Sequence, residues 1–450
     1  MESIGPYSTD AEPISPFAQL AALAAYLSDA EIESICHQLG HDFRRRRLPP
    51  GTLVRSIVYR SLHPDKSIKS TLADLAAGSG LIRTEPTDAA WCQARSRLPS
   101  ELWPVLLQRS VQRVADGVGT KYHYHGRPTY TVDGSTVSMP DTPELVTAFG
   151  YADTKHGPSR FPVARITFIA QAGAETVADY RIDPYRTAES TQFHAMWDRL
   201  PSGAICLCDR HFSSFYDLAK LGQRGIDVIS CLHQRRDPNR LIAQGRKIGR
   251  HQWAVPLDLA PQLRKAYRDP TLPQVISVRL IRVSFMRNGQ RRQLWLVTTL
   301  LDSKRYPRPE IIQLYRDRWG IETRIDSLKT TLKLAVLRSK TPPALQCELA
   351  ATVLAHNLTW TIIHQAAHQT RTPAARISFA GTLKIILTFS AALRAAGAAD
   401  RPAIYRHMLD YIARQTNPHR PNRIEPRLIK RQTKRYGFLK VPRAEARKSA

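Results

Sequence analysis

The sequence predicts an α/β fold in which a mixed sheet is flanked by helices and interrupted by a second, β-rich block. Three observations favour this class. Short strand-like segments alternate with helical patterns from Tyr130 to about residue 225, a further run of strand-like segments occupies about residues 228–296, and helical patterns precede and follow them. A chain of 450 residues is long enough for roughly two to four domains or subdomains with a large buried core.

Residues 17 to about 120 are predicted to be helical. Apolar residues recur at helical spacing in FAQLAALAAYLSDAEIESICHQL, LPPGTLVRSIVYRSL, SIKSTLADLAAG and DAAWCQARSRLPSELWPVLLQRSVQRVAD. Ser28 and Glu31 have the spacing of a capping box, which predicts a helix start there. Between two of these segments, HDFRRRRLPP holds the consecutive arginines Arg44 to Arg47, which suit either a solvated loop or contacts with phosphate groups.

The region from Tyr130 supplies the strands of the predicted sheet. TYTVDGSTVSM, FPVARITFIAQ and ETVADYRID are expected to be three strands, and AICLC a fourth, buried strand that ends at Asp209 and leads into a helix. Farther along, QVISVRLIRVSFMRNGQRRQLWLVTTLLD predicts a β-hairpin with a two-residue turn at Asn288 and Gly289. Helical patterns return from Arg308 onward.

The charge balance points to a polyanionic partner. The chain has 66 Lys and Arg against 38 Asp and Glu, a formal net charge of +28. Nucleic acid is the partner that this charge favours first, ahead of the ribosome or an anionic membrane. Residues 414–450 hold 12 Lys or Arg and 2 Glu and are expected to lie along a nucleic-acid backbone, although a disordered solubility tail has the same composition. No apolar run approaches the roughly 18 residues of a membrane span, and residues 1–15 lack a signal-peptide pattern, so the chain is expected in the cytosol.

Cysteine and histidine spacing does not indicate a zinc site. The six cysteines are scattered and are expected to be reduced. Cys206 and Cys208 would share one face of a strand, but structural zinc needs two further ligands, and the same holds for His123 and His125. A role in the core or at the surface is the simpler interpretation for all four residues.

One helical pattern, LYRDRWGIETRIDSLKTTLKL at residues 314–334, places charged residues beside an apolar face. At about 100° per residue, Tyr315, Arg318, Glu322 and Lys329 fall within a stripe about 60° wide. The neighbouring apolar face consists of Leu314, Ile321, Ile325, Leu328 and Leu332. The stripe therefore borders the core, although a solvated flank with an ordinary Arg318–Glu322 pair accounts for the spacing equally well.

Three acidic residues stand out by their positions. Asp133 lies within or at the end of the first predicted strand, Asp209 ends a later buried strand, and Glu322 belongs to the charged stripe. Burying a carboxylate costs several kcal/mol unless it is paired or bound to a metal. Three converging carboxylates would bind Mg²⁺, for which Mn²⁺ can substitute, and a pair of such ions supports in-line attack on a phosphodiester.

The rest of the stripe fits the same hypothesis. Arg318 can grip a phosphate through two N–H donors, and Lys329 can serve as a point charge beside it. Tyr315 would add a phenolic donor at the edge of the site. These three residues are therefore candidate DNA-binding residues.

The spacing of Tyr315, Arg318, Glu322 and Lys329 resembles the Tyr-Arg-Glu-Lys signature of the insertion-sequence-4 family of transposases, which includes the cut-and-paste enzymes of the Tn5 and Tn10 type. The segments TVDGS and LCDRHFSS resemble the two aspartate motifs of that family. The likeness extends over nearly the whole chain, from RRRRLPP and QARSRL to the basic ending RIEPRLIKRQTKRYGFLKVPR.

The resemblance implies a catalytic domain of ribonuclease H-like fold with Asp133, Asp209 and Glu322 as its DDE triad and metal ligands. The 112 residues between Asp209 and Glu322 agree with a β-rich insertion. The implied parts are a helical DNA-binding domain at 1–125, the first part of the catalytic domain at 126–228, the β-rich insertion at 229–296, the second part of the catalytic domain at 297–370, and a helical, basic C-terminal region at 371–450.

Relatives of the Tn5 type pass through a DNA hairpin whose flipped base stacks on a tryptophan of the insertion. Trp253 and Trp295 are the tryptophans of this insertion. Trp295 lies in an apolar strand and is expected in the core, so Trp253 is the candidate DNA-binding residue. The residues leave open whether a hairpin is formed.

The resemblance implies a transposase that binds terminal inverted repeats as a homodimer in a synaptic complex, cleaves double-stranded DNA at the element ends and joins 3′ ends to target DNA. Such a protein would act in the bacterial cytoplasm, associated with the nucleoid when bound to DNA. A catalytically inactive DNA-binding relative or repressor is the main alternative, which the intact triad opposes. A ribonuclease H-like nuclease or resolvase without end joining is another, which the Tyr-Arg-Lys stripe and the basic flanks oppose.

Overall fold

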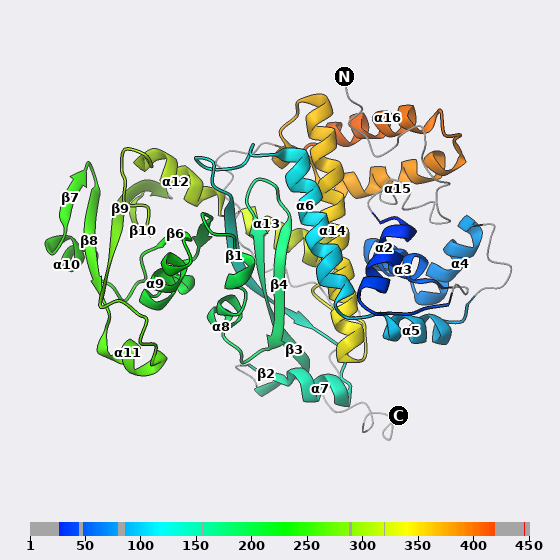
Figure 1. The fold of residues 1–450 in the computed structure, drawn as a ribbon, viewed down its shortest axis with the longest axis horizontal. Coiled ribbons are helices and arrows are strands. Elements are labelled where there is room, and N and C mark those ends of the chain that lie inside the picture. The colour runs from blue at the N-terminus through cyan, green and yellow to red at the C-terminus, as the bar shows by residue number, and fades with distance from the viewer. Residues whose placement is uncertain are drawn as a thin grey trace. The chain divides into compact units, whose positions relative to one another are not determined.

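The structure, a computed structural model, describes residues 27–44, 48–79, 86–154, 157–287, 290–318, 320–418 and residue 445. The described residues up to Thr416 belong to one compact unit. Its ten-stranded sheet runs from the left of the view to the middle, and the helices of the N-terminal and C-terminal parts lie on the right (Figure 1). No described helix is both long enough and apolar enough to span a membrane.

The N-terminal region is helical, as predicted. Its helices are α2 (Asp29–Gln38), α3 (Pro50–Leu62), α4 (Ile68–Ser79), α5 (Asp88–Arg97) and α6 (Leu102–Val118). The Ser28 side chain accepts a hydrogen bond from the Glu31 N–H at 3.2 Å, which confirms the predicted helix start. Residues 17–26 and the arginines at 45–47 lie outside the described residues.

Five strands form a mixed sheet with the connectivity of a ribonuclease H fold: β1 (Thr129–Ser138), β3 (Gly157–Gln171), β4 (Val177–Pro184), β5 (Ile205–Cys208) and β6 (Asp227–Cys231). β3 is antiparallel to both β1 and β4, whereas β1, β5 and β6 are parallel neighbours. The order β4-β3-β1-β5-β6 confirms the predicted fold class. The fully buried run of β5 explains its place inside the sheet, where both faces are covered.

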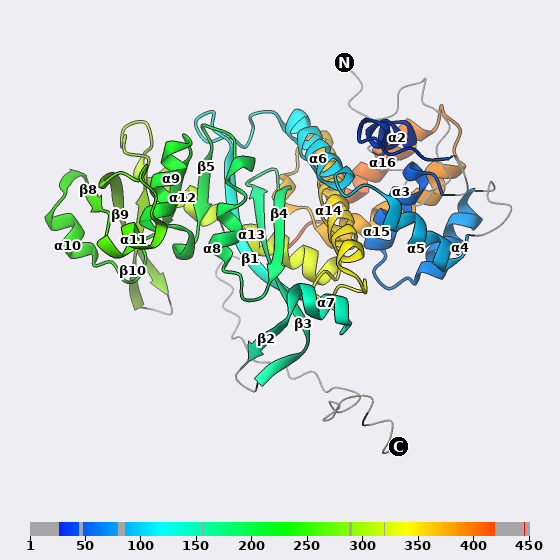
Figure 2. The same ribbon diagram turned by 60° about the horizontal axis from the view of Figure 1, so that its bottom comes forward.

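Shorter elements connect these strands. They are α7 (Pro143–Phe149), β2 (Tyr151–Thr154), α8 (Glu189–His194), the 3₁₀ turns Trp197–Arg199 and Arg210–Phe212, and α9 (Phe215–Gln223). β2 pairs with the beginning of β3, and the two extend beyond the rest of the sheet (Figure 2).

The β-rich block continues the same sheet. It contains α10 (Pro238–Ala243), β7 (Arg246–Gly249), β8 (Gln252–Asp258), α11 (Pro261–Tyr267), β9 (Val275–Arg287) and β10 (Gln290–Thr298). β10 pairs antiparallel with β6, which joins the block to the central strands. β9 and β10 form the predicted hairpin, with Arg287 opposite Gln290, while Asn288 and Gly289 lie outside the described residues.

The prediction of one continuous helix over residues 314–334 is wrong. The segment divides into α12 (Arg308–Asp317), α13 (Gly320–Asp326) and a π-helical turn (Ser327–Thr331). The Arg318 N–H bonds the Tyr315 carbonyl and the Ile321 N–H bonds the Arg318 carbonyl, so the chain tightens to i→i+3 bonding there. Gly320, a poor helix former, lies within the second of these bonds. A wheel drawn at a constant angle therefore does not describe the segment.

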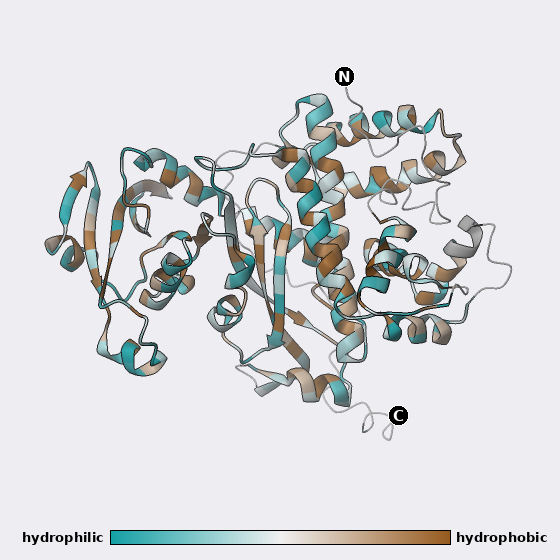
Figure 3. Ribbon diagram, viewed as in Figure 1, coloured by the Kyte–Doolittle hydropathy of each residue, from teal (hydrophilic) through white to brown (hydrophobic). Residues whose placement is uncertain are grey.

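The C-terminal half of the chain contributes α14 (Pro342–Thr370), the 3₁₀ turn Ala374–Arg376, α15 (Phe379–Ala395) and α16 (Arg401–Arg414). α14 is buried over most of its length and packs against α3, α6, α15 and α16. Hydrophobic residues line α14 and the central strands (Figure 3). Most of the predicted basic tail, from residue 419 onward, lies outside the described residues.

Candidate active site

Asp133 lies on β1 where pairing with β5 stops. β1 pairs with β5 only over Thr129–Thr131, whereas its pairing with β3 continues to Ser138. The Asp133 carboxylate accepts a hydrogen bond from the Gly134 N–H at 2.8 Å. Burial raises the pKa of Asp133 to about 6, and the negative charges of Asp209 and Glu322 act in the same direction, against the Gly134 N–H and the charge of Arg318.

Asp209 follows β5 directly and caps a 3₁₀ turn. Its carboxylate accepts from the His211 N–H at 2.7 Å and lies 3.1 Å from the His211 ring nitrogen Nδ1. The Ser230 hydroxyl donates to the Asp209 carbonyl at 2.8 Å, and Ser214 and Asp217 form a capping box that starts α9. Polar residues of the segment LCDRHFSS, together with Asp217 and Ser230, therefore fix the loop that carries the carboxylate.

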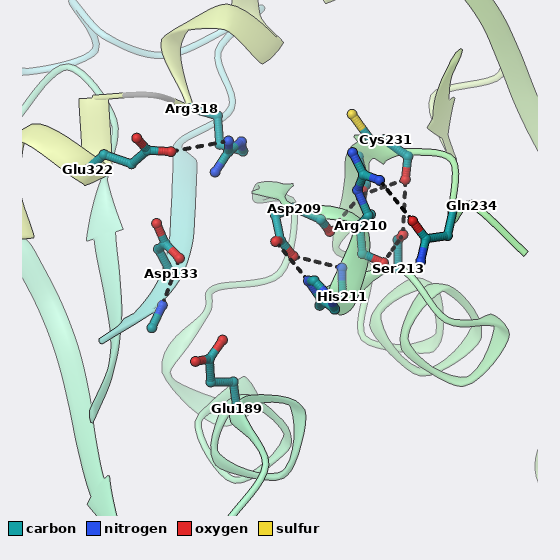
Figure 4. Close-up of polar contacts among 12 residues, drawn as sticks. Asp133, Glu189, Asp209, Arg210, His211, Ser213, Cys231, Gln234, Arg318 and Glu322 are labelled. Carbon is teal, nitrogen blue, oxygen red and sulfur yellow. Dashed lines mark hydrogen bonds and ion pairs between the residues drawn. The ribbon is translucent and has the colours of Figure 1, made fainter. Parts of the chain in front are cut away.

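Glu322 comes from α13 and is about half exposed, with 45% of its side chain accessible. Arg318 Nη2 lies 3.6 Å from Glu322 Oε1. The carboxylates of Asp133, Asp209 and Glu322 point toward a common region from three separate elements (Figure 4). As placed, no three His, Cys, Asp or Glu side chains of the described residues are close enough to hold a metal ion. The three carboxylates therefore point toward one region but are too far apart to share a ligand position.

The other members of the predicted stripe contact different elements. Tyr315 is buried, and its hydroxyl lies 2.9 Å from the Cys231 sulfur on β6, rather than at the edge where DNA was expected. Burial raises the pKa of Tyr315 above its ordinary range. The Lys329 ammonium donates to the Ser135 hydroxyl on β1 at 2.9 Å. The Arg318 guanidinium is largely buried beside the Tyr315 ring.

Trp253 lies on β8 and is half-buried against Trp295 of β10, which was expected in the core and is half-buried as well. Their ring centroids are 5.6 Å apart. The Arg282 guanidinium lies 5.9 Å from the Trp253 ring and 6.0 Å from the Trp295 ring. The two rings and the guanidinium thus form one cluster, away from the three acids in the sequence and in the sheet order.

Glu189 is an acidic residue of this region that the sequence analysis did not identify. It begins α8, forms an ion pair with Arg165 at 2.7 Å, and points toward the region between Asp133 and Asp209 (Figure 4). A Cβ atom on Gly134 would lie 2.4 Å from Glu189 Cδ. In the sequence, Gly134 was a weak indication of this contact, because a glycine inside a strand often marks a place where another group approaches the backbone closely.

The three acids suit a divalent ion in their donor chemistry. All are hard oxygen donors, which Mg²⁺ and Mn²⁺ prefer. Asp133 in particular is a partly buried carboxylate whose ionisation is opposed by burial and by two neighbouring acids. A bound cation would relieve that repulsion.

The chain is similar to known transposases. The chain is 26% identical over 430 residues to the transposase InsG for insertion sequence element IS4 of Escherichia coli K12, covering 93% of each chain. It is 29% identical over 184 residues to the putative transposase InsZ of the same organism, covering 40% of this chain and 60% of that relative. A solved synaptic complex of piggyBac transposase with hairpin DNA matches with a TM-score of 0.44 and 10% identity, covering 89% of this chain and 86% of that one.

A family profile covers the part of the chain that holds the three acids. Residues 124–358 match the profile described as the transposase DDE domain. This range is more than half of the 450 residues and includes the whole mixed sheet, α13 and the first part of α14. The chain therefore belongs to the family of DDE-domain transposases of the insertion-sequence-4 type.

Proposed function

We propose that the protein cleaves double-stranded DNA at the terminal inverted repeats of an insertion sequence and joins the freed 3′ ends to target DNA. One observation carries the proposal: Asp133, Asp209 and Glu322, from three separate elements, point toward a common region beside Arg318 (Figure 4). This is a set of oxygen donors with a phosphate-binding group at its edge. Hydrolysis and transfer of phosphodiesters need both features.

Asp133, Asp209 and Glu322 would hold Mg²⁺, or Mn²⁺ in its place. When bound there, divalent ions lower the pKa of an attacking water or 3′-hydroxyl and neutralise charge on the phosphate. The protein's own contribution is to bring the three carboxylates together from β1, the loop after β5 and α13. The His211 N–H and the Gly134 N–H keep two of these carboxylates oriented.

Arg318 and Lys329 would hold the DNA phosphates next to the cut. The Arg318 guanidinium offers two parallel donors and already lies near Glu322. Lys329 donates to Ser135, which follows Asp133 by two residues on the same strand. The ammonium charge of Lys329 therefore lies beside β1, close to Asp133. Tyr315, the third predicted residue, would act mainly through the ring that packs beside Arg318.

The remaining parts would bind DNA more broadly. The helical region at 1–125, the insertion at 229–296 with Trp253, and the basic residues of 371–450 are our proposed DNA-binding parts around a catalytic domain at 126–228 and 297–370. Two element ends must be cut and joined in concert, so the active complex is proposed to be a homodimer on DNA. We place it in the bacterial cytoplasm, on the nucleoid.

The test is an assay with a labelled duplex that carries the end of the protein's own element, together with supercoiled target plasmid. With Mg²⁺ we expect nicked ends and then joined products, and with a chelator neither. Mass measurement of the protein–DNA complex should give two protein copies for two ends. Binding without cleavage in Mg²⁺ or Mn²⁺ would instead support a catalytically inactive DNA-binding relative.

A further inference from the structure

We infer that Arg324 is a positioning residue that sets Glu322 against Asp133, acting through Glu175 and Thr131. The inference rests on the proposed function, because it assigns how two of the three proposed metal ligands are held at their relative positions. Arg324 lies on α13, two residues after Glu322. Its role in the site is therefore indirect.

The Arg324 side chain is a buried cation with two separate partners. Only 2% of the side chain is exposed. Arg324 Nη2 donates to Glu175 Oε1 at 2.8 Å, and Arg324 Nε lies 2.6 Å from Glu175 Oε2, so both carboxylate oxygens face the guanidinium. Arg324 Nη1 donates to the Thr131 hydroxyl at 3.2 Å. One side chain thus ties α13 to β1 and to the turn between β3 and β4.

The turn that holds Glu175 is itself fixed to α14. Glu175 has a φ of 61°, a left-handed conformation that is costly for a residue other than glycine. The Asn357 side chain of α14 bonds both the N–H and the carbonyl of Val177 at 2.9 Å. His364 Nε2 lies 2.8 Å from the Ala174 carbonyl. Hydrogen bonds to α14 therefore hold the turn from which the Glu175 carboxylate contacts Arg324.

Arg324 and Lys329 bracket Asp133 along one face of β1. Thr131, Asp133 and Ser135 are alternate residues of the strand, so their side chains share a face. Arg324 bonds the Thr131 hydroxyl and Lys329 bonds the Ser135 hydroxyl. Asp133 lies between these two contacts, opposite the segment that carries Glu322. The two bonds fix the position of this segment along β1.

Without the Arg324 contacts, the bond from Lys329 to Ser135 and the apolar residues Ile321 and Ile325 would still hold the segment, but no polar contact would fix α13 at Thr131. Apolar packing is compatible with small shifts along the strand. A metal site is sensitive to such shifts, because its ligands must meet at fixed distances. We therefore expect the loss of these contacts to weaken metal binding more than it weakens DNA binding. DNA contacts are spread over many basic residues and depend less on one helix.

The test compares Glu175→Gln, Thr131→Val and Arg324→Lys with the unmodified protein. Glu175→Gln and Thr131→Val keep the shape of the side chain, so they decide the outcome if Arg324→Lys fails to fold. The Mg²⁺ concentration for half-maximal nicking should rise about tenfold in Glu175→Gln and Arg324→Lys, and less in Thr131→Val. Mn²⁺ binding to the DNA-free protein, followed by electron paramagnetic resonance, should weaken to the same degree. Gel shifts of the element end should not change.

Asp227→Asn is the matched control. It breaks the ion pair of Asp227 with Arg127, 2.6 Å long, at the start of β6 and apart from α13. It should lower the unfolding temperature without changing the Mg²⁺ requirement or Mn²⁺ binding. A Mg²⁺ requirement equal to the unmodified protein's in folded Glu175→Gln and Arg324→Lys, or an equal change in Asp227→Asn, would overturn the inference.

Glu322→Ala separates this inference from the proposed function. If Glu322→Ala nicks as well as the unmodified protein, the proposed function fails and the inference fails with it. If Glu322→Ala abolishes nicking while the Glu175, Thr131 and Arg324 variants keep the normal metal requirement, only the inference fails.

Discussion

Asp133 shows at the scale of one residue how this sheet accommodates an acid inside a strand. β5 pairs with β1 only as far as Thr131, so Asp133 lies two residues past the last paired position of that edge. The loop after β5 and helix α13 bring Asp209 and Glu322 toward the same edge. Burial and the two neighbouring acids raise the pKa of Asp133, so this arrangement disfavours its charged form.

Gly134→Ala should damage the site through Glu189. The new Cβ atom would lie 2.4 Å from Glu189 Cδ, and the ion pair with Arg165 limits how far Glu189 can move. We expect the free energy of unfolding in urea to fall by about 1–3 kcal/mol, the range for overpacking, together with reduced nicking. Adding Glu189→Ala should restore stability. Full stability in Gly134→Ala alone would show that Glu189 moves away freely.

Substitutions at Arg318, Lys329 and Tyr315 should give a graded series in the nicking assay. Arg318→Ala and Lys329→Ala remove a charged contact worth about 1.5–3 kcal/mol, which is a loss of roughly 10–100-fold in rate. Tyr315→Phe removes one hydroxyl, which contacts Cys231, so its effect on rate should be smallest. Equal rates for all three variants and the unmodified protein would mean that these residues only border the core.

Individual residues differed in how far the sequence could identify them. The positions of Asp133 within β1 and of Asp209 directly after β5 were predictable from the strand patterns, while their joint role stays a prediction. Glu189 and the Arg324–Glu175 pair were not, because each contact joins segments that are distant in the chain and meet only in the folded protein. The position of Tyr315 was predicted only from its angle on a helical wheel. Its hydroxyl contacts Cys231, which belongs to β6 and could not be identified from the helical segment.

At the scale of elements, strands were easier to predict than the helix that carries Glu322. The strands β1, β3 and β9 are rich in β-branched and aromatic residues and appear where expected. Apolar spacing across residues 314–334 is an average, and it hides both the break after Asp317 and the π-helical turn at Ser327–Thr331. π-helical turns are frequent at functional sites.

Helix α14 predicts a pH effect on stability through His356. Burial lowers the pKa of His356 to about 3, and its Nε2 accepts a hydrogen bond from the Trp360 indole at 3.2 Å, which requires the neutral ring. Below the ordinary value of 6.5 the unfolded chain binds a proton that the folded chain does not, so the free energy of unfolding falls as pH decreases toward 3. This contribution is constant above pH 6.5.

His356→Gln should flatten that dependence. Urea unfolding of both proteins between pH 7 and pH 4 should show a slope smaller by up to about 1.4 kcal/mol per pH unit in the variant. His63 and His364, whose pKa values are also lowered by burial, are unchanged in both proteins. Identical slopes would show that His356 can take up its proton in the folded state.

At the scale of the whole molecule, one sheet joins the central strands to the β-rich block, and α14 contacts β4 as well as N-terminal and C-terminal helices. Composition alone predicted the nucleic-acid partner, because charge is a property of the entire chain. The continuity of the sheet through β6 and β10 was not predictable, because strand pairing between distant segments leaves no local pattern.

The net charge of +28 predicts that affinity for DNA falls steeply as salt concentration rises, because many Lys and Arg contacts displace counterions. Removing residues 417–450, with 11 Lys or Arg and 2 Glu, should lower affinity for any sequence and reduce the salt slope. The truncation should begin after Thr416, because Thr416 pairs with Ile377 and should be kept. A salt slope near zero, or one unchanged by the deletion, would contradict this expectation.

The central claim is that Asp133, Asp209 and Glu322 act together in DNA cleavage and not in DNA binding. The most direct measurement is Mg²⁺-dependent cleavage of a labelled element end, beside a gel shift of the same DNA, for Asp133→Ala, Asp209→Ala and Glu322→Ala, with the exposed Asp258→Ala as control. We expect each of the three to lose cleavage and joining while binding persists or improves, and the control to cleave normally. Cleavage at the normal rate by any one of the three variants would contradict the account.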